Sequence, residues 1–191
     1  MKKWRIDFNA PVILGFAGIS FIVLVLSTIF GKQVQYALGA AFSSWTDPFQ
    51  YTRLFTHVFT HGDLAHFTGN MMLILAVGPI VEEKYGAKPM VIVIALTALV
   101  TGLVNVIFFR NQLLIGASGI VFMLILLASF VNIREGKIPL TVILAAALYI
   151  GNEIVTGVSV QDNISQISHI IGGLCGGVFG YVYHYKKILQ E

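Results

Sequence analysis

The chain has 191 residues, of which 57% are hydrophobic and 11% are charged, and its mean hydropathy is +0.83. A soluble domain carries roughly 25% charged residues, so this composition excludes an ordinary soluble fold and indicates a polytopic membrane protein. The net charge of +3 comes with no basic patch that would indicate a nucleic-acid partner. The single cysteine, Cys175, excludes an intramolecular disulfide.

Long uncharged runs mark the expected membrane spans, because about 18 apolar residues are needed to cross a bilayer. One further run contains Glu153, which we place at the water boundary because a charge at mid-membrane is costly. We therefore expect an all-α fold with one membrane domain over residues 1–191. Its six spans are expected at about 11–31, 64–82, 89–109, 115–133, 138–156 and 167–185. The first run exceeds the roughly 7 to 15 residues of a signal-peptide core, so we expect it to be retained.

The basic residues predict the orientation of these spans. Six spans place both termini on one side, and nine of the twelve Lys and Arg residues fall on that side. The positive-inside rule then predicts an N-in/C-in topology, in the inner or plasma membrane of a cell. The long outer connection, residues 32–63, is rich in aromatic residues and is expected to lie partly in the membrane interface.

A serine between glycines, in the run Gly116-Ala117-Ser118-Gly119, enters the expected fourth span. Glycines let a backbone approach closely, and the first N–H groups of a helix can face an anion because they lack partners within the helix. Ser118 is therefore a candidate nucleophile beside a ready oxyanion site. The alternative is that these small residues only pack helices together.

Three further polar residues fall at the depth of Ser118. At 1.5 Å per residue, His66, Asn70 and His169 lie within roughly 10 Å of the outer ends of the second and sixth spans. A serine beside an imidazole can act as a nucleophile, and His66, Asn70 and the Ser118 amide can hold an oxyanion. Each residue alone could be structural, but burying several polar groups at one depth in lipid is expensive.

A glycine stripe follows the sixth-span histidine at positions Gly172, Gly176 and Gly180. Such a stripe lets helix backbones approach closely and would bring His169 toward Ser118. We expect these glycines, with Gly116 and Gly119, to serve helix packing.

Two other kinds of site fit the sequence less well. A metal site at His57, His61 and His66 is disfavoured because their spacing does not place all three on one helical face, and no Cys, Asp or Glu completes the set. No cofactor motif is found. A small transporter would be expected to have an inverted repeat with broken helices, and neither is seen.

Polar residues near the outer ends of the spans leave one question open. Thr68, Ser165, Gln166 and Ser168 could line a small wet cavity that supplies water, or they could merely finish helix ends. Asp162 is too far toward the interface to orient His169 as a third catalytic residue.

Four motifs occur in order along the chain. They are His57-xxx-His61 with His66-xxx-Asn70, then Glu82-Glu83-Lys84-Tyr85-Gly86, then Gly116-x-Ser118-Gly119, and finally His169-xx-Gly172-xxx-Gly176. Together they resemble the rhomboid family of intramembrane serine proteases, in its minimal six-span bacterial or archaeal form.

The resemblance implies a Ser118–His169 dyad, with His66, Asn70 and the Ser118 amide as oxyanion donors. It implies cleavage of other transmembrane proteins near the outer face of the bilayer, and no cofactor. The alternative is an inactive rhomboid-like scaffold that binds membrane clients. Two departures stand out: Phe122 replaces a tyrosine found in many relatives, and Trp45 is followed by Thr46 where several relatives carry arginine.

Overall fold

The computed structural model describes residues 8–129, 131, 140, 143–144, 147–148, 151 and 163–188, with the side chains of the last stretch described over 167–183. The elements in chain order are α1 (Pro11–Phe30), α2 (Lys32–Leu38), α3 (Pro48–Thr56), the 3-10 turn η1 (His57–Phe59), α4 (Leu64–Tyr85), α5 (Ala87–Phe108), α6 (Ser118–Ser129) and α8 (Asn163–Ile188). The all-α prediction is confirmed for these residues. The expected fifth span, with Glu153, lies largely outside them, as does Asp162.

Three of the described helices are long and apolar enough to cross a membrane, namely α1, α4 and α5. Helix α6 and residues 167–183 of α8 are shorter apolar helices. Large apolar side chains on the outer surfaces of these helices are exposed, such as Phe21 at 55% and Leu174 at 62%. Exposed apolar surface on this scale fits a lipid environment.

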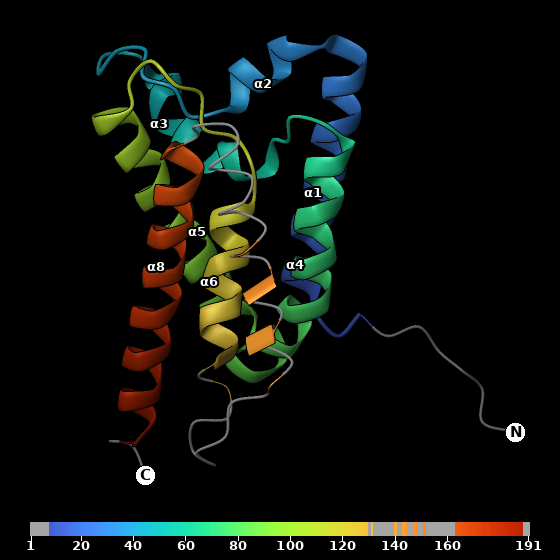
Figure 1. The fold of residues 1–191 in the computed structure, drawn as a ribbon, viewed down its shortest axis with the longest axis vertical. Helices are drawn as coiled ribbons and strands as arrows, with labels where there is room; N and C mark the ends of the chain where they lie inside the picture. The colour runs from blue at the N-terminus through green and yellow to red at the C-terminus, as the bar shows by residue number, and fades with distance from the viewer. Residues whose placement is uncertain are drawn as a thin grey trace, which may run out of the picture.

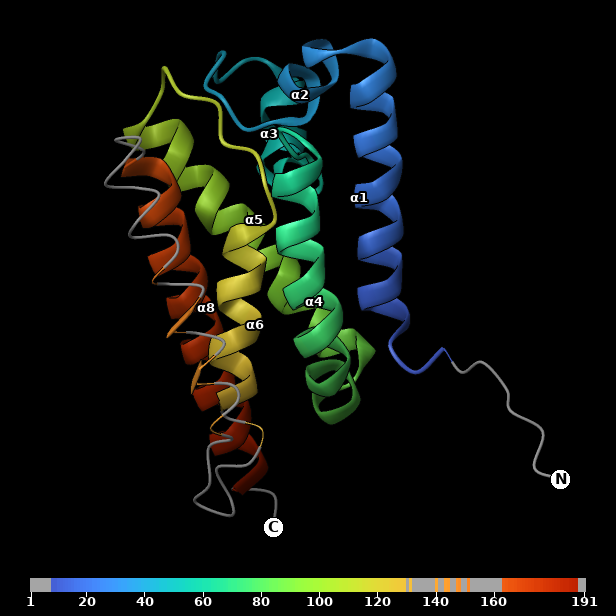
Figure 2. The ribbon, with the colours of Figure 1, turned by 45° about the vertical axis from the view of Figure 1, so that its right-hand side comes forward.

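Helix α6 forms the centre of the bundle. It contacts α4, α5 and α8, and α8 packs along it over most of the described length (Figures 1 and 2). Nearly all of its residues are buried, on every side of the helix. A helix that is apolar all round is stable only when surrounded, so the composition of α6 accounts for its place in the core.

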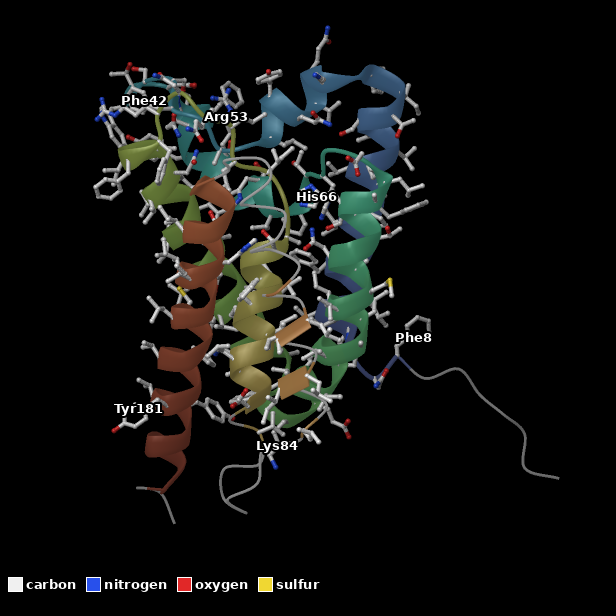
Figure 3. The ribbon with its side chains drawn as sticks, in the orientation of Figure 1. Phe8, Phe42, Arg53, His66, Lys84 and Tyr181 are labelled. Atoms are coloured by element: carbon white, nitrogen blue, oxygen red, sulfur yellow. The ribbon has the colours of Figure 1, made fainter. Side chains whose placement is uncertain are left out.

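Helices α4, α6 and α8 run in the same direction. Figure 3 shows His66 near one end of α4 and Lys84 at the other, and both views show α8 ending at the Lys84 end, where α1 begins. The residues that open α4, α6 and α8 therefore gather at one end of the bundle. That end also carries α2 and α3.

At the opposite end, a buried carboxylate joins α4 to the start of α1. The oxygens of Glu82, which is 3% exposed, accept hydrogen bonds from the backbone N–H groups of Val12 at 3.0 Å and Ile13 at 2.9 Å. Ala10, the residue that precedes α1, offers no side-chain cap. A carboxylate at a helix N-terminus satisfies unpaired donors and complements the helix dipole. Glu82 thereby fixes α1 against α4.

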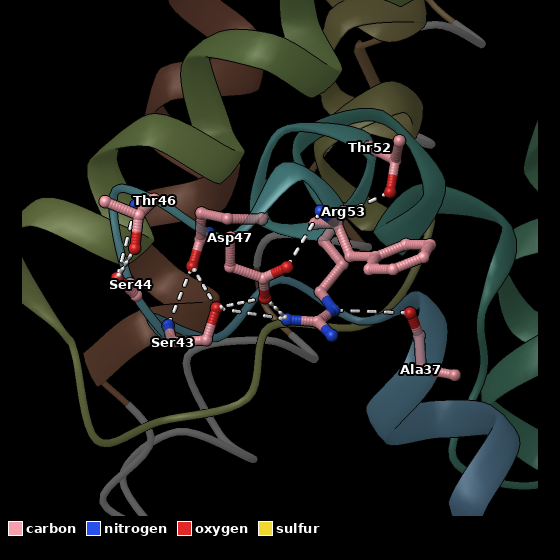
Figure 4. Close-up of polar contacts among 9 residues, drawn as sticks. Ala37, Ser43, Ser44, Thr46, Asp47, Thr52 and Arg53 are labelled. Carbon is pink, nitrogen blue, oxygen red and sulfur yellow. Dashed lines mark hydrogen bonds and ion pairs between the residues drawn. The ribbon is translucent and has the colours of Figure 1, made fainter.

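The segment between α1 and α4 is ordered by polar contacts around Arg53 (Figure 4). The guanidinium of Arg53 forms an ion pair with Asp47 at 3.3 Å and donates to the hydroxyl of Ser43 and to the carbonyl of Ala37. Asp47 also caps α3 by accepting from the Phe49 N–H at 3.0 Å. The Ser43 hydroxyl, the Phe49 amide and Arg53 lower the pKa of Asp47 below its ordinary value. This network anchors the loop between α2 and α3, which contains Thr46.

Candidate active site

The loop that leads into Ser118 is held by contacts from distant parts of the chain. Ala40 and Leu114 form an isolated antiparallel pair, with both backbone hydrogen bonds at 2.9 Å. The side-chain amide of Asn105 donates to the carbonyls of Ala40 at 2.7 Å and Gln112 at 3.1 Å. These bonds join the segment between α2 and α3, the end of α5 and the loop before α6.

The last residue fixed in this way is Gly116. Its N–H donates to the carbonyl of His57 at 3.1 Å, and the imidazole Nε2 of His57 lies 3.0 Å from the carbonyl of Ala98 in α5. Gly116 has φ of +119°, which strains any residue with a side chain. A Cβ at this position would also meet the His66 ring, 2.7 Å from Nε2. Backbone conformation and close packing thus both require glycine two residues before Ser118.

Ser118 begins α6, three residues later than the span start expected at 115. The first backbone bond of the new helix runs from the Val121 N–H to the Ala117 carbonyl at 3.0 Å. The N–H of Ser118 therefore belongs to the first turn, whose donors have no acceptor within the helix. Ser118 is partly exposed, whereas Ala117 and Gly119 on either side are buried. The serine is thus accessible at the start of an otherwise enclosed helix.

His169 of α8 lies against the face of α6 that carries Ser118. Its ring, with the residue 3% exposed, stacks on Phe122 at a centroid distance of 4.7 Å and an interplanar angle of 10°. Phe122 is four residues after Ser118 and shares its helix face. Stacking on Phe122 therefore brings the imidazole to the Ser118 side of α6. Phenylalanine supplies this contact without the hydroxyl of a tyrosine.

Glycines allow α6 and α8 to meet backbone to backbone. A Cβ on Gly172 would collide with the Gly119 carbonyl, and a Cβ on Gly176 would collide with the Met123 carbonyl. Gly119 itself lies close to the Ser168 carbonyl, at 3.5 Å from an added Cβ. Gly180, one turn further along the stripe, is buried. The first two glycines of the stripe therefore face α6 one turn and two turns after His169.

His66 has a hydrogen bond that favours one tautomer of its ring. Its Nδ1 accepts from the Gly62 N–H at 3.4 Å, a long bond. An imidazole that accepts at Nδ1 carries its proton on Nε2, the nitrogen that faces Gly116. The ring thus presents a donor toward the turn that precedes Ser118. Asp63 sets the start of this helix by accepting from the His66 N–H at 2.7 Å.

Asn70 lies one turn further along α4 and is 2% exposed. Its Nδ2 donates to the His66 carbonyl at 3.1 Å. An amide nitrogen carries two N–H groups, so this bond engages one of them and fixes the direction of the other. His66 and Asn70 share one face of α4, as their four-residue spacing predicts.

His57 and His61 are fully enclosed, at 1% and 0% exposure. The His61 ring meets that of His66 edge to face at a centroid distance of 5.1 Å. Burial lowers the pKa of both His57 and His61 to about 4, so both are neutral at neutral pH. In the sequence these two histidines are visible only as disfavoured metal ligands and as parts of a motif. Their positioning role depends on the His57 carbonyl and on ring packing, for which the sequence carries no signal.

The polar residues proposed to line a wet cavity are only partly described. The Thr68 hydroxyl donates to the carbonyls of Leu64 and Ala65 within its own helix, as a residue that finishes a helix end does. Ser168 is buried beside the site. The side chains of Ser165 and Gln166 lie outside the described residues.

Comparison with known proteins gives a family match over most of the chain. A family described as "Rhomboid domain" matches residues 48–186, which include every candidate site residue. The chain is 33% identical over 81 residues to "Rhomboid-like protease 3" of Toxoplasma gondii, covering 42% of this chain and 31% of the relative. It is 29% identical over 150 residues to "RHOMBOID-like protein 4" of Arabidopsis thaliana, covering 73% of this chain and 36% of the relative.

The chain thus spans about a third of the length of these curated relatives. The family match covers the described elements from α3 to α8, except for the last two residues of α8, and it includes the α6–α8 contact. The helical bundle with its apolar outer surface and the family match agree, and the chain is a membrane protein that belongs to the rhomboid family.

Proposed function

We propose that this protein is an intramembrane serine endopeptidase that cleaves transmembrane proteins in or near their membrane segments by a Ser118–His169 dyad. The observation that carries the proposal is the stack of His169 on Phe122 at the glycine-lined contact of α6 and α8. It supports an imidazole held beside the partly exposed serine at the start of α6. The loop before Ser118 is fixed by backbone hydrogen bonds and by the φ of Gly116, which supports a single conformation of the turn that carries the nucleophile.

The chemistry follows from the roles of these groups. Ser118 Oγ attacks the carbonyl carbon of the scissile peptide bond while His169 accepts the hydroxyl proton. The oxyanion accepts hydrogen bonds from His66 Nε2, Asn70 Nδ2 and the Ser118 N–H. The tetrahedral intermediate collapses to the acyl-enzyme as the peptide C–N bond breaks, and His169 gives its proton to the leaving amine. Water then hydrolyses the acyl-enzyme with His169 again acting as base.

The proposal includes a topology of six spans with both termini inside, in the inner or plasma membrane. The shared direction of α4, α6 and α8 supports it, as does the position of Lys84 and Lys88 at the end of the bundle opposite the candidate site. In this orientation Ser118 lies near the outer face of the bilayer. The substrates are then membrane proteins cleaved close to that face.

A fluorophosphonate probe applied to the purified full chain in detergent tests the nucleophile. We expect labelling of the wild type and of Ser129→Ala, because the Ser129 hydroxyl donates to Ile125 within α6 and lies outside the site. We expect no labelling of Ser118→Ala or His169→Ala and no cleavage of a transmembrane substrate by either. Thermal unfolding of each variant verifies that it is folded.

Absence of labelling in the folded wild type would contradict the proposal and favour an inactive scaffold that binds membrane clients. Cleavage by Ser118→Ala at the wild-type rate would assign the activity to another residue. Normal labelling of His169→Ala would remove His169 as the base.

A further inference from the structure

An apolar cleft with a volume of about 370 Å³ lies between α1, the α3–η1 segment and α5, away from the candidate active site. It is lined by Pro11, Val12, Gly15, Phe16, Ile19, Phe55, Val58, Phe59, Val91, Ile94, Ala95 and Ala98. On the side of η1 it is closed by Phe59, whose ring packs on Phe16 at 4.8 Å. An apolar space of this kind does not hold ordered water, which needs polar partners.

The cleft opens sideways, toward the bilayer. Ile19, Phe55 and Val91 on its rim are 49%, 42% and 53% exposed. Both long walls, α1 and α5, are helices long and apolar enough to span a membrane. The surroundings of the opening are therefore lipid acyl chains.

A positive charge stands at one end of the cleft. Lys88 is exposed in the first turn of α5 and lies one turn before Val91 and two turns before Ala95, both of which line the cleft. Glu82, six residues before Lys88, binds the start of α1, so this end of the cleft is where both of its long walls begin. A lysine at the end of an apolar span reaches the headgroup layer, where it attracts anionic lipids.

We propose that the cleft binds one acyl chain of an anionic phospholipid, with the lipid phosphate paired to Lys88. The lipid comes from the leaflet next to the start of α5. This is the inner leaflet in the proposed topology, and the lipid site does not depend on the proposed catalytic activity. The arrangement of charge favours this occupant over an apolar helix of a second copy. A phospholipid carries an anionic headgroup at one end of an apolar chain, which matches Lys88 at one end of an otherwise apolar cleft.

Gly15 gives a direct way to fill the cleft. A Cβ added at Gly15 meets nothing within 4 Å, and Gly15 lines the cleft. Gly18 is its matched control, because an added Cβ there also meets nothing within 4 Å, but Gly18 is not part of the lining. Both changes to leucine raise helix propensity equally, so they differ only in whether they occupy the cleft.

The experiment uses the full chain in phosphatidylcholine vesicles that contain phosphatidylglycerol with a photoactivatable group in its acyl chain. After illumination, mass spectrometry identifies the cross-linked peptides. We expect cross-links concentrated on the cleft-lining parts of α1 and α5 in the wild type and in Gly18→Leu, and several-fold fewer there in Gly15→Leu. Photoactivatable phosphatidylcholine should label the cleft less than phosphatidylglycerol. Lys88→Gln should remove this preference, and Lys84→Gln, on α4, should keep it.

Equal labelling of the cleft in Gly15→Leu and Gly18→Leu would overturn the proposal, as would equal labelling by the two lipids in the wild type. Cross-links between two copies through α1 and α5, lost in Gly15→Leu, would assign the cleft to a second copy instead. Labelling by the serine probe in the same vesicles reports on Ser118 alone. A failure of the catalytic proposal is thereby distinguished from a failure of the lipid site.

Discussion

Phe122 and His169 stack almost face to face, with ring centroids 4.7 Å apart and ring planes 10° from parallel. The two rings come from α6 and α8 and join the helices that carry the two proposed catalytic residues. An aromatic pair contributes about 0.5 to 1.5 kcal/mol beyond its buried area. The stack therefore restricts the orientation of the His169 imidazole, and its contribution is small but measurable.

Replacing Phe122 by leucine should slow serine-probe labelling about 2- to 10-fold, the rate equivalent of losing the stacking energy. The apolar volume remains, but the flat surface that orients His169 is lost. Phe122→Tyr keeps the ring and should label at least as fast as the wild type. Rates are compared by following labelling over time. A leucine variant that labels at the wild-type rate would show that the stack does not position the base.

Removing a proposed oxyanion donor should slow cleavage without abolishing it. One such donor is typically worth about 2.7 to 4 kcal/mol, or roughly 100- to 1000-fold in rate. His66→Ala and Asn70→Ala should therefore retain weak cleavage of a transmembrane substrate, above that of Ser118→Ala. Initial rates in detergent provide the comparison, with Thr68→Ala as the control from the same helix. Full activity in both variants would exclude these residues from the site.

Gly176→Ala should destabilise the protein by about 1 to 3 kcal/mol because the added methyl overpacks a tight contact. Its Cβ would collide with the Met123 carbonyl and lie 3.0 Å from the Met123 Cα. Gly177→Ala is the matched change next to it, since the nearest atom to its Cβ is a Leu126 side-chain carbon at 4.0 Å. Gly177→Ala should be neutral or should stabilise by up to about 1 kcal/mol through helix propensity. Thermal unfolding of both variants tests this. Equal shifts in Tm would argue against a tight contact between α6 and α8 at Gly176.

Glu82→Gln should weaken the attachment of α1 by about 1.5 to 3 kcal/mol, the usual value of a hydrogen bond to a charged group. The neutral amide has one acceptor oxygen in place of two, so it cannot accept hydrogen bonds from the Val12 and Ile13 N–H groups on separate oxygens. Hydrogen exchange at these two amides should become faster. Glu83→Gln, at the exposed neighbouring position, is the control. Unchanged exchange in Glu82→Gln would mean that the carboxylate is not needed as a cap.

The buried histidines predict an acid-sensitive fold. Burial lowers the pKa of His57 from 6.5 to about 4. Between these values the unfolded chain binds a proton that the folded chain does not, so stability should fall as the pH drops from about 6.5 toward 4. His57→Gln should reduce the number of protons coupled to unfolding by about one. Unfolding measured across this pH range in detergent tests the slope, and a variant with the wild-type slope would contradict it.

The sequence predicts well those features that depend on local spacing. The four-residue interval between His66 and Asn70 places both on one helix face, and uncharged runs locate α1, α4 and α5 to within a few residues. The start of α6 at Ser118 was harder to predict, since it is set by the φ of Gly116 and by the bond to the His57 carbonyl.

The pairing of Ala40 with Leu114 could not be predicted for a similar reason. It joins backbone groups 74 positions apart, and backbone groups are the same in every residue. The cap of α1 by Glu82 is likewise a tertiary contact, because neither Ala10 nor the first turn of α1 signals that a carboxylate is needed. Contacts of this kind depend on the assembled fold and leave no periodic pattern in the chain.

The four-residue repeat of glycines on α8 has a consequence for how this helix could slide. Gly172 faces Gly119 and Gly176 faces Met123, so a shift of α8 by four residues, about 6 Å, would bring Gly176 to Gly119 and Gly180 to Met123. Glycines would then again lie at both contacts, so the glycine repeat by itself does not define the register of α8. The register of α8 is instead defined by side chains beside the glycines. These are the Phe122–His169 stack at one end and the hydrogen bond from the Tyr183 hydroxyl to the Tyr85 carbonyl at the other. The aromatic residues therefore define the position of α8 along α6. By doing so they set the level of His169 relative to Ser118.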